Sequence, residues 1–428
     1  MYVEHVSIHD FKGIEDCDLS FRKGFNLIIG ENGKGKTSLL EALSIGISGF
    51  LSGVHAPGVH ARNFQPEEAR AVYSLQGDGG YEPEYHWPSV RMTAEFEDAK
   101  DQTFQEYQWT RFRESHQAQT KTDPRDVCNR AETMSSNANT VLPVICYQSA
   151  ARVWSQKRKK QSDRSSREKR TRLAGYVDCL SDESSVKQML KWCVDMEMIA
   201  WQTDKPVREY EAVKKAVGDA MSQMEGRATS VFYDKRSEEL MYRQGQDVTP
   251  ISALSAGYQS LIWMVFDIAY RMAVLNPFLM ERIAETPGLV LIDELDLHLH
   301  PRWQWQVIDV LRRVFPRVQF IATTHSPIII ASAKDVWCID IENLKKPKEQ
   351  RSGYGLEVNY ILRQVQNASD LPDSIQSILE DFYQCIDAED FMGAKKALAR
   401  LESEIGKESP LAVKARERLE LELALSEG

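Results

Sequence analysis

The sequence lacks the features that mark membrane and secreted proteins. No part of its 428 residues approaches the roughly 18 uninterrupted apolar residues that a membrane-spanning helix needs. Residues 1–10 contain neither a basic segment nor an apolar leader. The seven cysteines are scattered and include no Cys-x-x-Cys pair, so no disulfide framework is indicated. These absences predict a cytoplasmic protein.

Excess positive charge is also missing, because the net charge is −10. This balance argues against a protein that is covered by nucleic acid. Residues 157–172 are a local exception, with nine Lys or Arg against two acidic residues. This segment is either a solvated loop or a contact for nucleic-acid phosphates.

The pattern of apolar residues predicts several elements along the chain. Alternation over residues 90–112 indicates an antiparallel hairpin. The polar stretch 114–140 has little periodicity and is expected to be a loop or a partly disordered insert. Helices are predicted over 210–224 and, almost wholly apolar and therefore buried, over 255–275. The charged tail, 373–426, indicates three more helices.

A phosphate-binding loop stands out among the features that are present. Residues 30–37, Gly-Glu-Asn-Gly-Lys-Gly-Lys-Thr, follow an apolar strand and precede a helix-forming stretch. Glycines in such a loop let backbone N–H groups face a polyphosphate, and the helix adds the positive end of its dipole. Lys36 is expected to reach the β- and γ-phosphates, and Thr37 to bind Mg²⁺. The predicted nucleotide-binding residues of this loop are Asn32, Gly33, Lys34, Gly35, Lys36, Thr37 and Ser38.

Two carboxylates end a second apolar strand, at residues 289–292. At the carboxyl end of such a strand, Asp293 is expected to hold the metal through water. Glu294 is expected to orient and deprotonate the attacking water. The alternative is a strand that happens to end in a charged turn.

Three weaker signals accompany these motifs. Ser255 and Gly257 open the predicted buried helix, and such an end suits an anion, although a serine there is commonly only a cap. His325 follows the apolar strand 319–322 and is a candidate to bind the γ-phosphate, or else a local carbonyl. Gln148 is the candidate for a glutamine that senses magnesium and the attacking water, or is only polar surface.

Taken in this order, the motifs resemble those of the ATP-binding-cassette (ABC) ATPases of the RecF, SMC and OLD type. Residues 8–14, Ile-His-Asp-Phe-Lys-Gly-Ile, look like that group's Asn-Phe-Arg-Gly opening, with Asp10 and Lys12 as departures. Residues 294–304, Gly175-Tyr176 followed by Trp192, and the helical tail are similar to the bacterial PtuA ATPase subunits. Those subunits occur in Septu anti-phage systems and in related retron operons.

The resemblance implies an α/β fold, namely an ABC-type P-loop ATPase with a mixed β-sheet core, an antiparallel β subdomain, a helical insert and a helical C-terminal tail. Lobe I, with the P-loop and the antiparallel subdomain, is expected over 1–150. The basic loop and helical insert are expected over 151–250. Lobe II is expected over 251–345, and it contains the family's signature segment around Ser255 and Gly257, the acidic strand and the histidine. The tail is expected over 346–428.

The resemblance also implies ATP and Mg²⁺ as cofactors and self-association as a head-to-tail dimer or a higher oligomer. Ser255 and Gly257 of one subunit would then meet the nucleotide held by the other subunit, and Asp296 would join the nucleotide-binding set. An HNH nuclease is the implied partner, with DNA or a retron RNA–DNA molecule as a further candidate and no membrane. The implied catalytic residues are Glu294, His325 and Gln148, and the implied metal-binding residues are Thr37, Asp293 and Gln148.

The sequence also bears on three other functions. An OLD-like nuclease needs a Toprim domain with a second acidic centre, but the 103 residues after His325 (428 − 325) offer only Asp340 and Glu342. A DNA-repair ATPase of the RecF or SMC type stays as an alternative, although SMC-type heptad arms are missing. A scaffold that binds ATP without hydrolysis is the other alternative, and the carboxylate of Glu294 argues against it.

Overall fold

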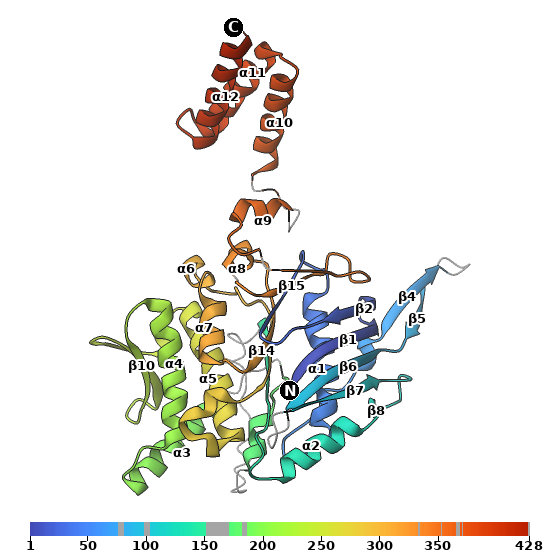
Figure 1. Ribbon diagram of the computed structural model, residues 1–428, viewed down its shortest axis with the longest axis vertical. Coiled ribbons are helices and arrows are strands. Elements are labelled where there is room, and N and C mark those ends of the chain that lie inside the picture. Colours follow the sequence, from blue (N-terminus) through green and yellow to red (C-terminus); the bar gives the residue numbers. More distant parts are fainter. Residues whose placement is uncertain are drawn as a thin grey trace. The chain divides into compact units, whose positions relative to one another are not determined.

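The structure is a computed structural model that describes residues 1–75, 81–97, 103–150, 171–181, 186–332, 334–351, 353–364, 369 and 371–426. The chain divides into two compact units, Met1–Leu356 and Glu357–Gly428, and each is described by itself (Figure 1). The finer division of the first unit into lobes at residues 150, 250 and 345 stays a prediction.

A six-stranded sheet forms the centre of the first unit, in the order β16-β15-β3-β14-β13-β9. Its strands pair in parallel except β15 with β16. The residues of β3, β9, β13 and β14 are buried throughout, which explains why their sequences are continuously apolar rather than alternating. The bounds are β3 (Phe25–Ile29), β9 (Val144–Gln148), β13 (Gly288–Ile292), β14 (Val318–Thr323), β15 (Trp337–Asp340) and β16 (Lys348–Arg351).

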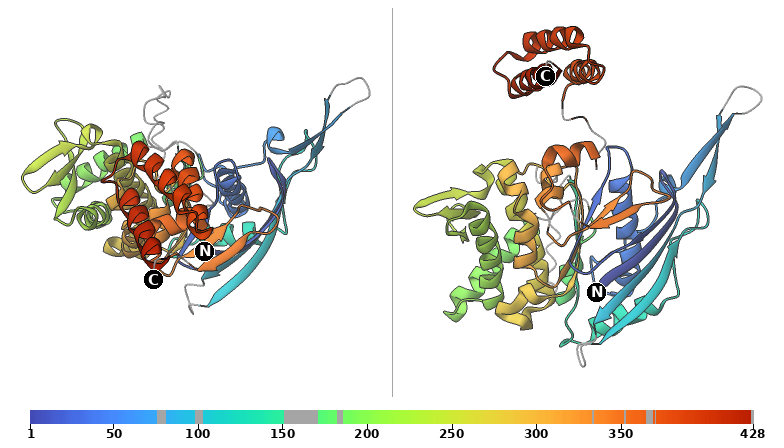
Figure 2. Two further views of the ribbon diagram at one scale, coloured as in Figure 1. Left: turned by 90° about the horizontal axis from the view of Figure 1, so that it is seen from above. Right: turned by 45° about the horizontal axis from the view of Figure 1, so that its top comes forward.

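A five-stranded antiparallel sheet, in the order β2-β1-β6-β7-β8, lies beside the central one (Figure 1). Its β6–β7 pair confirms the hairpin predicted over residues 90–112. A separate two-stranded hairpin, β4–β5, projects from the unit (Figure 2). The bounds are β1 (Tyr2–Phe11), β2 (Ile14–Ser20), β4 (Arg70–Leu75), β5 (Tyr81–His86), β6 (Ser89–Glu97), β7 (Phe104–Phe112) and β8 (Lys121–Asp123).

Helix α1 (Lys36–Leu51) begins at the P-loop and packs between these two sheets (Figures 1 and 2). Two glycines of α1 allow the helix to lie close to strands β6 and β7 of the antiparallel sheet. A Cβ on Gly46 would lie 2.6 Å from the Met92 side chain, and one on Gly49 would lie 2.4 Å from the indole nitrogen of Trp109. The buried Trp109 donates this N–H to the Gly46 carbonyl at 2.8 Å. The antiparallel sheet therefore fixes the helix that carries the P-loop.

Helices cover the opposite face of the central sheet, with α5 and α7 against it and α4 outside them (Figure 1). The helices predicted over 210–224 and 255–275 are confirmed as α4 and α5. A three-stranded sheet, β10-β11-β12, packs on α4. The bounds are α3 (Val186–Thr203), α4 (Arg208–Glu225), β10 (Thr229–Asp234), β11 (Glu239–Gln244), β12 (Asp247–Pro250), α5 (Ala256–Leu275), α6 (Pro301–Gln304), α7 (Val307–Val314) and α8 (Pro327–Ser332). Short 3-10 segments lie at Pro66–Glu68, Arg172–Tyr176, Ile251–Ala253 and Pro277–Glu285.

The prediction that residues 114–140 lack regular secondary structure is wrong. Strand β8 and helix α2 (Asp126–Ser136) form there. Helix α2 buries Val127, Ala131 and Met134 against the first unit's core. These three apolar residues lie at helical spacing, but the polar residues around them hide the pattern in the sequence.

The second unit contains α9 (Val358–Gln364), α10 (Asp373–Asp387), α11 (Phe391–Ile405) and α12 (Pro410–Ser426). Helices α10 to α12 confirm the three predicted in the tail, and they share a core centred on Phe382, Ala394 and Leu401. Among the helices that the structure describes, none is both long enough and apolar enough to cross a membrane.

We expect Gly49→Ala to lower the free energy of unfolding by about 1–3 kcal/mol, because the new methyl group would overlap the buried Trp109 ring. Chemical denaturation of the variant and the wild type measures the change. Gly13→Ala is the control, since nothing lies within 4 Å of a Cβ at that position. Equal unfolding midpoints for Gly49→Ala and the wild type would contradict this packing.

Candidate nucleotide-binding site

The candidate site lies where three neighbouring parallel strands end. The P-loop follows β3, His325 follows β14 shortly after its end, and Asp293 and Glu294 follow β13. Because the carboxyl ends of parallel strands meet at one edge of a sheet, these segments are brought together.

The P-loop has the backbone that its glycines predict. Gly33 and Gly35 have φ angles of 80° and 89°, in the left-handed region that glycine adopts without strain. The Lys36 ammonium donates to the carbonyls of Gly30 and Glu31, both at 2.8 Å. Burial lowers the pKa of Lys36, although nearby carboxylates, above all Asp293, oppose the shift.

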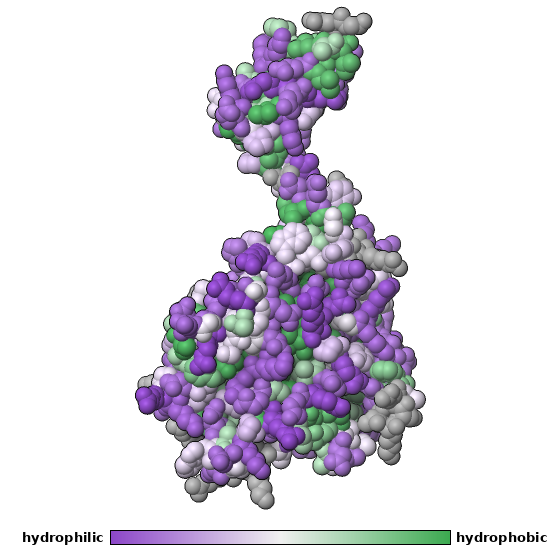
Figure 3. All heavy atoms as spheres, turned by 60° about the vertical axis from the view of Figure 1, so that its left-hand side comes forward, coloured by the Kyte–Doolittle hydropathy of each residue, from purple (hydrophilic) through white to green (hydrophobic). Residues whose placement is uncertain are grey.

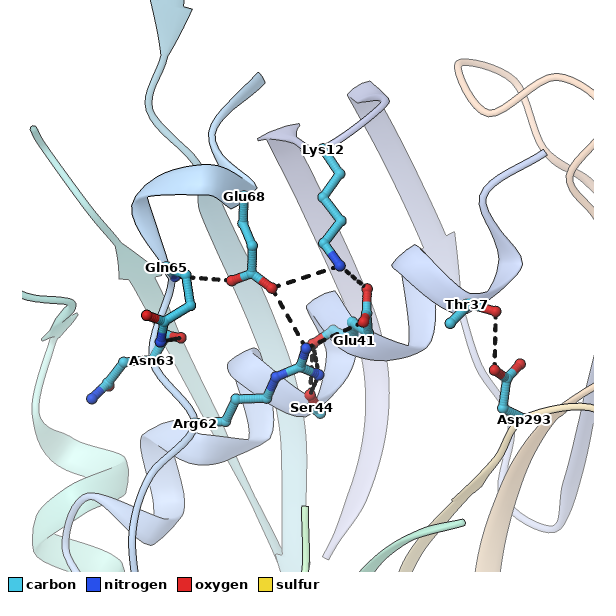
Figure 4. Close-up of polar contacts among 9 residues, drawn as sticks. All are labelled: Lys12, Thr37, Glu41, Ser44, Arg62, Asn63, Gln65, Glu68 and Asp293. Carbon is cyan, nitrogen blue, oxygen red and sulfur yellow. Dashed lines mark hydrogen bonds and ion pairs between the residues drawn. The ribbon is translucent and has the colours of Figure 1, made fainter. Parts of the chain in front are cut away.

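Thr37 and Asp293 meet directly. The Thr37 hydroxyl donates to the Asp293 carboxylate at 2.9 Å (Figure 4). The second carboxylate oxygen accepts from the Thr323 hydroxyl at 2.7 Å, and Asp293 is only 3% exposed. A hydroxyl and a carboxylate are the oxygen ligands that Mg²⁺ prefers. This pair therefore fits the metal that the sequence predicts.

Glu294 has a φ angle of 49°, which is unusual for a residue other than glycine. Its N–H donates to the Thr323 hydroxyl at 2.8 Å, and the Leu295 N–H donates to the Thr323 carbonyl at 2.9 Å. These two bonds stabilise the left-handed turn. Residues held in sparsely populated conformations cluster at functional sites.

His325 lies in the same electrostatic environment. Burial lowers its pKa, the Lys36 ammonium lowers it further, and the carboxylates led by Asp296 oppose both. Asp296 accepts from the Thr324 hydroxyl and from the His325 N–H, the latter at 3.3 Å. The structure thus brings Lys36, Asp293, Asp296 and His325 together.

The signature segment begins α5. Ser255 is the N-cap residue, is exposed and makes no capping bond with its side chain. A Cβ on Gly257 would lie 2.6 Å from the His298 carbonyl oxygen, so this position needs glycine for the turn after Glu294 to approach. The contact of Ser255 and Gly257 with a second subunit stays a prediction.

Ala256 and Tyr258 depart from the Leu-Ser-Gly-Gly-Gln signature of transporters, with Tyr258 at the position of the glutamine. The contacts of Tyr258 explain the tyrosine at this position. Its hydroxyl donates to Glu225 at 2.5 Å. Its ring packs edge-on against Trp303, with centroids 4.6 Å apart, and against Tyr242 at 5.9 Å. Burial raises the pKa of Tyr258. The tyrosine thus connects α5 to α4, β11 and α6.

The backbone of Gln148 reaches the site, but its side chain is bound elsewhere. Its carbonyl accepts from the Asp293 N–H at 2.8 Å. Its buried amide donates to Asp267 of α5 at 2.7 Å, and Asp267 also pairs with Arg271 at 3.0 Å. A role of Gln148 in metal or water sensing remains a prediction, and it requires the amide to leave Asp267.

Sequence reasoning missed a role for Glu342 at the P-loop. Its carboxylate accepts from the Glu31 N–H at 2.7 Å and pairs with the Lys34 ammonium at 3.1 Å. Burial tends to raise the pKa of Glu342, but these partners bring it below its ordinary value. The local signal was an acidic residue two positions after the apolar strand β15, but the pairing of β15 with β3, which brings Glu342 to the P-loop, is not visible in the sequence.

A second missed feature is an ion-pair network between the opening turn and α1 (Figure 4). Lys12 pairs closely with Glu41, and it lies 3.7 Å from Glu68. Arg62 lies 3.4 Å from Glu41 and 3.5 Å from Glu68. Lys12 is one of the two departures from the family's opening motif, and here two glutamates compensate its charge.

Most of the basic segment 157–172 lies outside the described residues. Its last residue, Arg172, donates to the carbonyls of Thr140 and Asn137 at 2.8 and 2.7 Å. This arginine therefore has a structural role.

The fold and the site define an ABC-type P-loop ATPase. The family model described as "AAA domain" matches residues 5–225, and one described as "AAA domain, putative AbiEii toxin, Type IV TA system" matches residues 195–331. The first match covers more than half of the chain, so the protein belongs to the AAA domain family.

Among its relatives, the chain resembles the PtuA proteins. It is 24% identical to the Septu protein PtuA of Bacillus thuringiensis, over 99% of this chain and 98% of that protein. It is also 24% identical to the retron Vc95 probable ATPase of Vibrio cholerae, over 77% of this chain and 71% of that protein. A match to the retron Ec83 probable ATPase of Escherichia coli is local and spans 31% of that protein. An SMC head structure aligns with a TM-score of 0.49 and 17% identity, covering 82% of this chain and 98% of that chain.

We expect protonation of His325 to affect ATP turnover only below pH 6.5, the ordinary pKa of histidine, because the site lowers this pKa. The neutral imidazole is then the form present at neutral pH, and turnover falls as the pH drops through the lowered pKa. The measurement is the pH–rate profile of the wild type and of His325→Gln. The variant should lack this acid limb, and an identical limb in both proteins would contradict the assignment.

Proposed function

We propose that this protein is a Mg²⁺-dependent ATPase subunit of a bacterial anti-phage defence system of the Septu or retron type. In this proposal, its ATP-dependent dimer controls an HNH nuclease partner. The observation that supports the ATPase most strongly is the Thr37–Asp293 contact at 2.9 Å. It joins the end of the P-loop to the acidic strand at the position where a nucleotide-bound metal is held in P-loop ATPases.

The residues present fit Mg²⁺ and a triphosphate. Thr37 would supply a hard oxygen ligand and Asp293 would hold the ion through water. The backbone N–H groups of residues 33–37, in the P-loop and the first turn of α1, would supply donors for phosphate oxygens. Bound there, the ion would neutralise phosphate charge and align the phosphates. Lys36 now binds two loop carbonyls, and its ammonium would exchange these for phosphate oxygens.

Glu294 and His325 would act on the attacking water and the γ-phosphate. Glu294 lies one residue beyond the metal ligand, so its carboxylate would orient a water and accept its proton. The lowered pKa of His325 keeps its imidazole neutral, with one N–H to donate to a phosphate oxygen and no added charge beside Lys36. Asp296 orients the histidine segment through the His325 N–H.

The position of the signature segment supports the proposed dimer. Ser255 is exposed at the start of a 20-residue helix, and the N-terminus of a helix favours an anion. In a head-to-tail arrangement, this end would meet the γ-phosphate held by the P-loop of the other subunit. Each active site would then need residues of two chains.

The defence role and the nuclease partner are inferred from the likeness to Septu PtuA and the retron ATPases. The neighbouring reading frame is the simplest observation that bears on them. A small HNH protein encoded there would support the Septu type, and a reverse transcriptase would support the retron type.

We expect Glu294→Gln to reduce the rate of ATP turnover by about 10²- to 10⁴-fold, because the amide cannot accept the proton of the attacking water. Nucleotide affinity should stay within a few-fold of the wild type, since Lys36 and Thr37 are unchanged. The measurements are a steady-state phosphate-release assay and binding of a fluorescent ATP analogue. The control is Glu281→Gln, because Glu281 is exposed and lies outside the site. If the wild type and Glu294→Gln bind ATP and are equally inert, the protein is a nucleotide-bound scaffold.

A mixing experiment tests whether the active site is shared. We expect Lys36→Ala and Ser255→Arg each to abolish turnover, the first in the P-loop and the second at the exposed helix end. Mixed together, they can form a dimer with one intact site, made from the P-loop of one variant and the signature of the other. Recovery of part of the wild-type rate supports the dimer. Full activity of Ser255→Arg alone, or no recovery from two folded variants, would overturn it.

A further inference from the structure

The hairpin β4–β5 carries an apolar face without a core beneath it. Residues that pair across an antiparallel hairpin point to the same face. The pairs Ala71–Tyr85, Tyr73–Pro83 and Leu75–Tyr81 therefore share one face. Tyr73, Leu75 and Tyr81 are 63%, 67% and 72% exposed.

The opposite face of the hairpin is polar. Its pairs are Arg70–His86, Val72–Glu84 and Ser74–Glu82, so it carries two acidic residues and one arginine. A nucleic-acid surface would combine such aromatics with a groove of positive charge. In the described part of the hairpin, the one arginine is Arg70, which pairs with Glu15 at 3.1 Å, and the apolar face is uncharged. This chemistry favours a protein partner.

A second exposed apolar surface lies on the other side of the same unit, where α3 meets β10 and the turn that follows it (Figures 1 and 2). It is a groove of about 400 Å³ lined by Val194, Met198, Trp201 and Tyr233, with Glu197 and Glu238 among its polar residues. Trp201 is 76% exposed. The side of the unit that Figure 3 brings forward is mainly hydrophilic, with hydrophobic areas among the polar ones. An exposed tryptophan in a groove is typical of a binding surface.

We propose that the apolar face of the β4–β5 hairpin binds the α3–β10 groove of a second copy of this chain. This single contact covers both exposed surfaces, whereas pairing of two hairpins leaves every groove open. A projecting hairpin and a concave groove are also complementary in shape, whereas two hairpin faces are both convex.

The area involved suits a specific interface. From the burial of about 150–250 Å² per aromatic side chain, the exposed fractions correspond to roughly 400–500 Å² of apolar surface on the hairpin and a similar area around the groove. Non-obligate interfaces are about 57% apolar. The two surfaces together then correspond to a total of roughly 1,500 Å², which is the standard size of a stable protein–protein contact.

The polar groups match as well. Buried tyrosine hydroxyls need hydrogen-bond partners, and the hairpin face would bring those of Tyr73, Tyr81 and Tyr85 to the groove. The groove offers the carboxylates of Glu197 and Glu238 as acceptors. Glu197 lies 3.9 Å from Lys235, so its charge is partly compensated within the groove.

The two surfaces differ and lie on opposite sides of the unit, so the contact is heterologous. Such contacts join copies in series and end either in a ring or in a filament. This assembly does not depend on nucleotide, which distinguishes it from the proposed ATP-dependent dimer.

Cross-linking between two marked copies tests the proposal. One copy carries Pro83→Cys on the apolar face of the hairpin and the other Gln202→Cys at the groove, so that the aromatic side chains of both surfaces stay in place. Both copies carry Cys385→Ser, because the other six cysteines are buried. Without nucleotide, a short bismaleimide should cross-link the mixture and neither copy alone. Glu84→Cys mixed with Gln202→Cys is the matched control from the polar face, and it should react several-fold less. Cross-linking of Pro83→Cys with itself would indicate hairpin pairing and overturn the proposal, and so would the absence of any cross-link.

Sedimentation velocity provides a second measurement on the full-length chain without nucleotide. Tyr73→Ser combined with Tyr81→Ser, and separately Trp201→Ser, should each weaken self-association at least tenfold. These side chains are exposed, so the fold is expected to tolerate their loss. The control is Tyr354→Ser, which removes an aromatic ring that is 57% exposed elsewhere. If only the hairpin variant weakens association, or if neither does, the groove is not the partner surface.

Discussion

The parallel pairing of β3, β14 and β13 is the constraint on which the candidate site depends. It places the ends of three strands at one edge of the sheet, where Thr37 and Asp293 lie within hydrogen-bond distance although 256 residues separate them in the chain. The antiparallel sheet supports this arrangement from the other side of α1, since Trp109 and the glycines of that helix fix its position. A loss of either packing layer would separate the P-loop from the acidic strand.

Much of this arrangement could be predicted from the sequence because its signals are local. The glycines of the P-loop, the carboxylates after a continuously apolar strand and the histidine after another each require a particular backbone position. The parallel sheet then brings those positions together. The side-chain bonds of Gln148 could not be predicted, since Asp267 is 119 residues away and nothing local marks it as a partner.

Two of the features that sequence reasoning missed depend on charges from distant segments. Glu342 meets the P-loop only because β15 pairs with β3. Lys12 is explained only when Glu41 and Glu68 lie beside it. Helix α2 was missed for another reason, because its buried positions are few among polar neighbours. The pattern of residues along the chain therefore does not reveal the pairing of distant strands, or a helix that buries only a few of its residues.

Helix α5 joins two of the features described above. Its first turn carries the exposed signature, and Asp267, which holds the amide of Gln148, lies twelve residues after Ser255, about 18 Å along a helix with a rise of 1.5 Å per residue. The buried Asp267–Arg271 pair and the carbonyls of Gly175 and Val177 that Arg271 binds make that attachment stiff. Because a helix is rigid along its axis, α5 couples its first turn to this buried attachment. Any displacement of Ser255 along the axis would reach Asp267, and with it the side chain that holds the amide of Gln148.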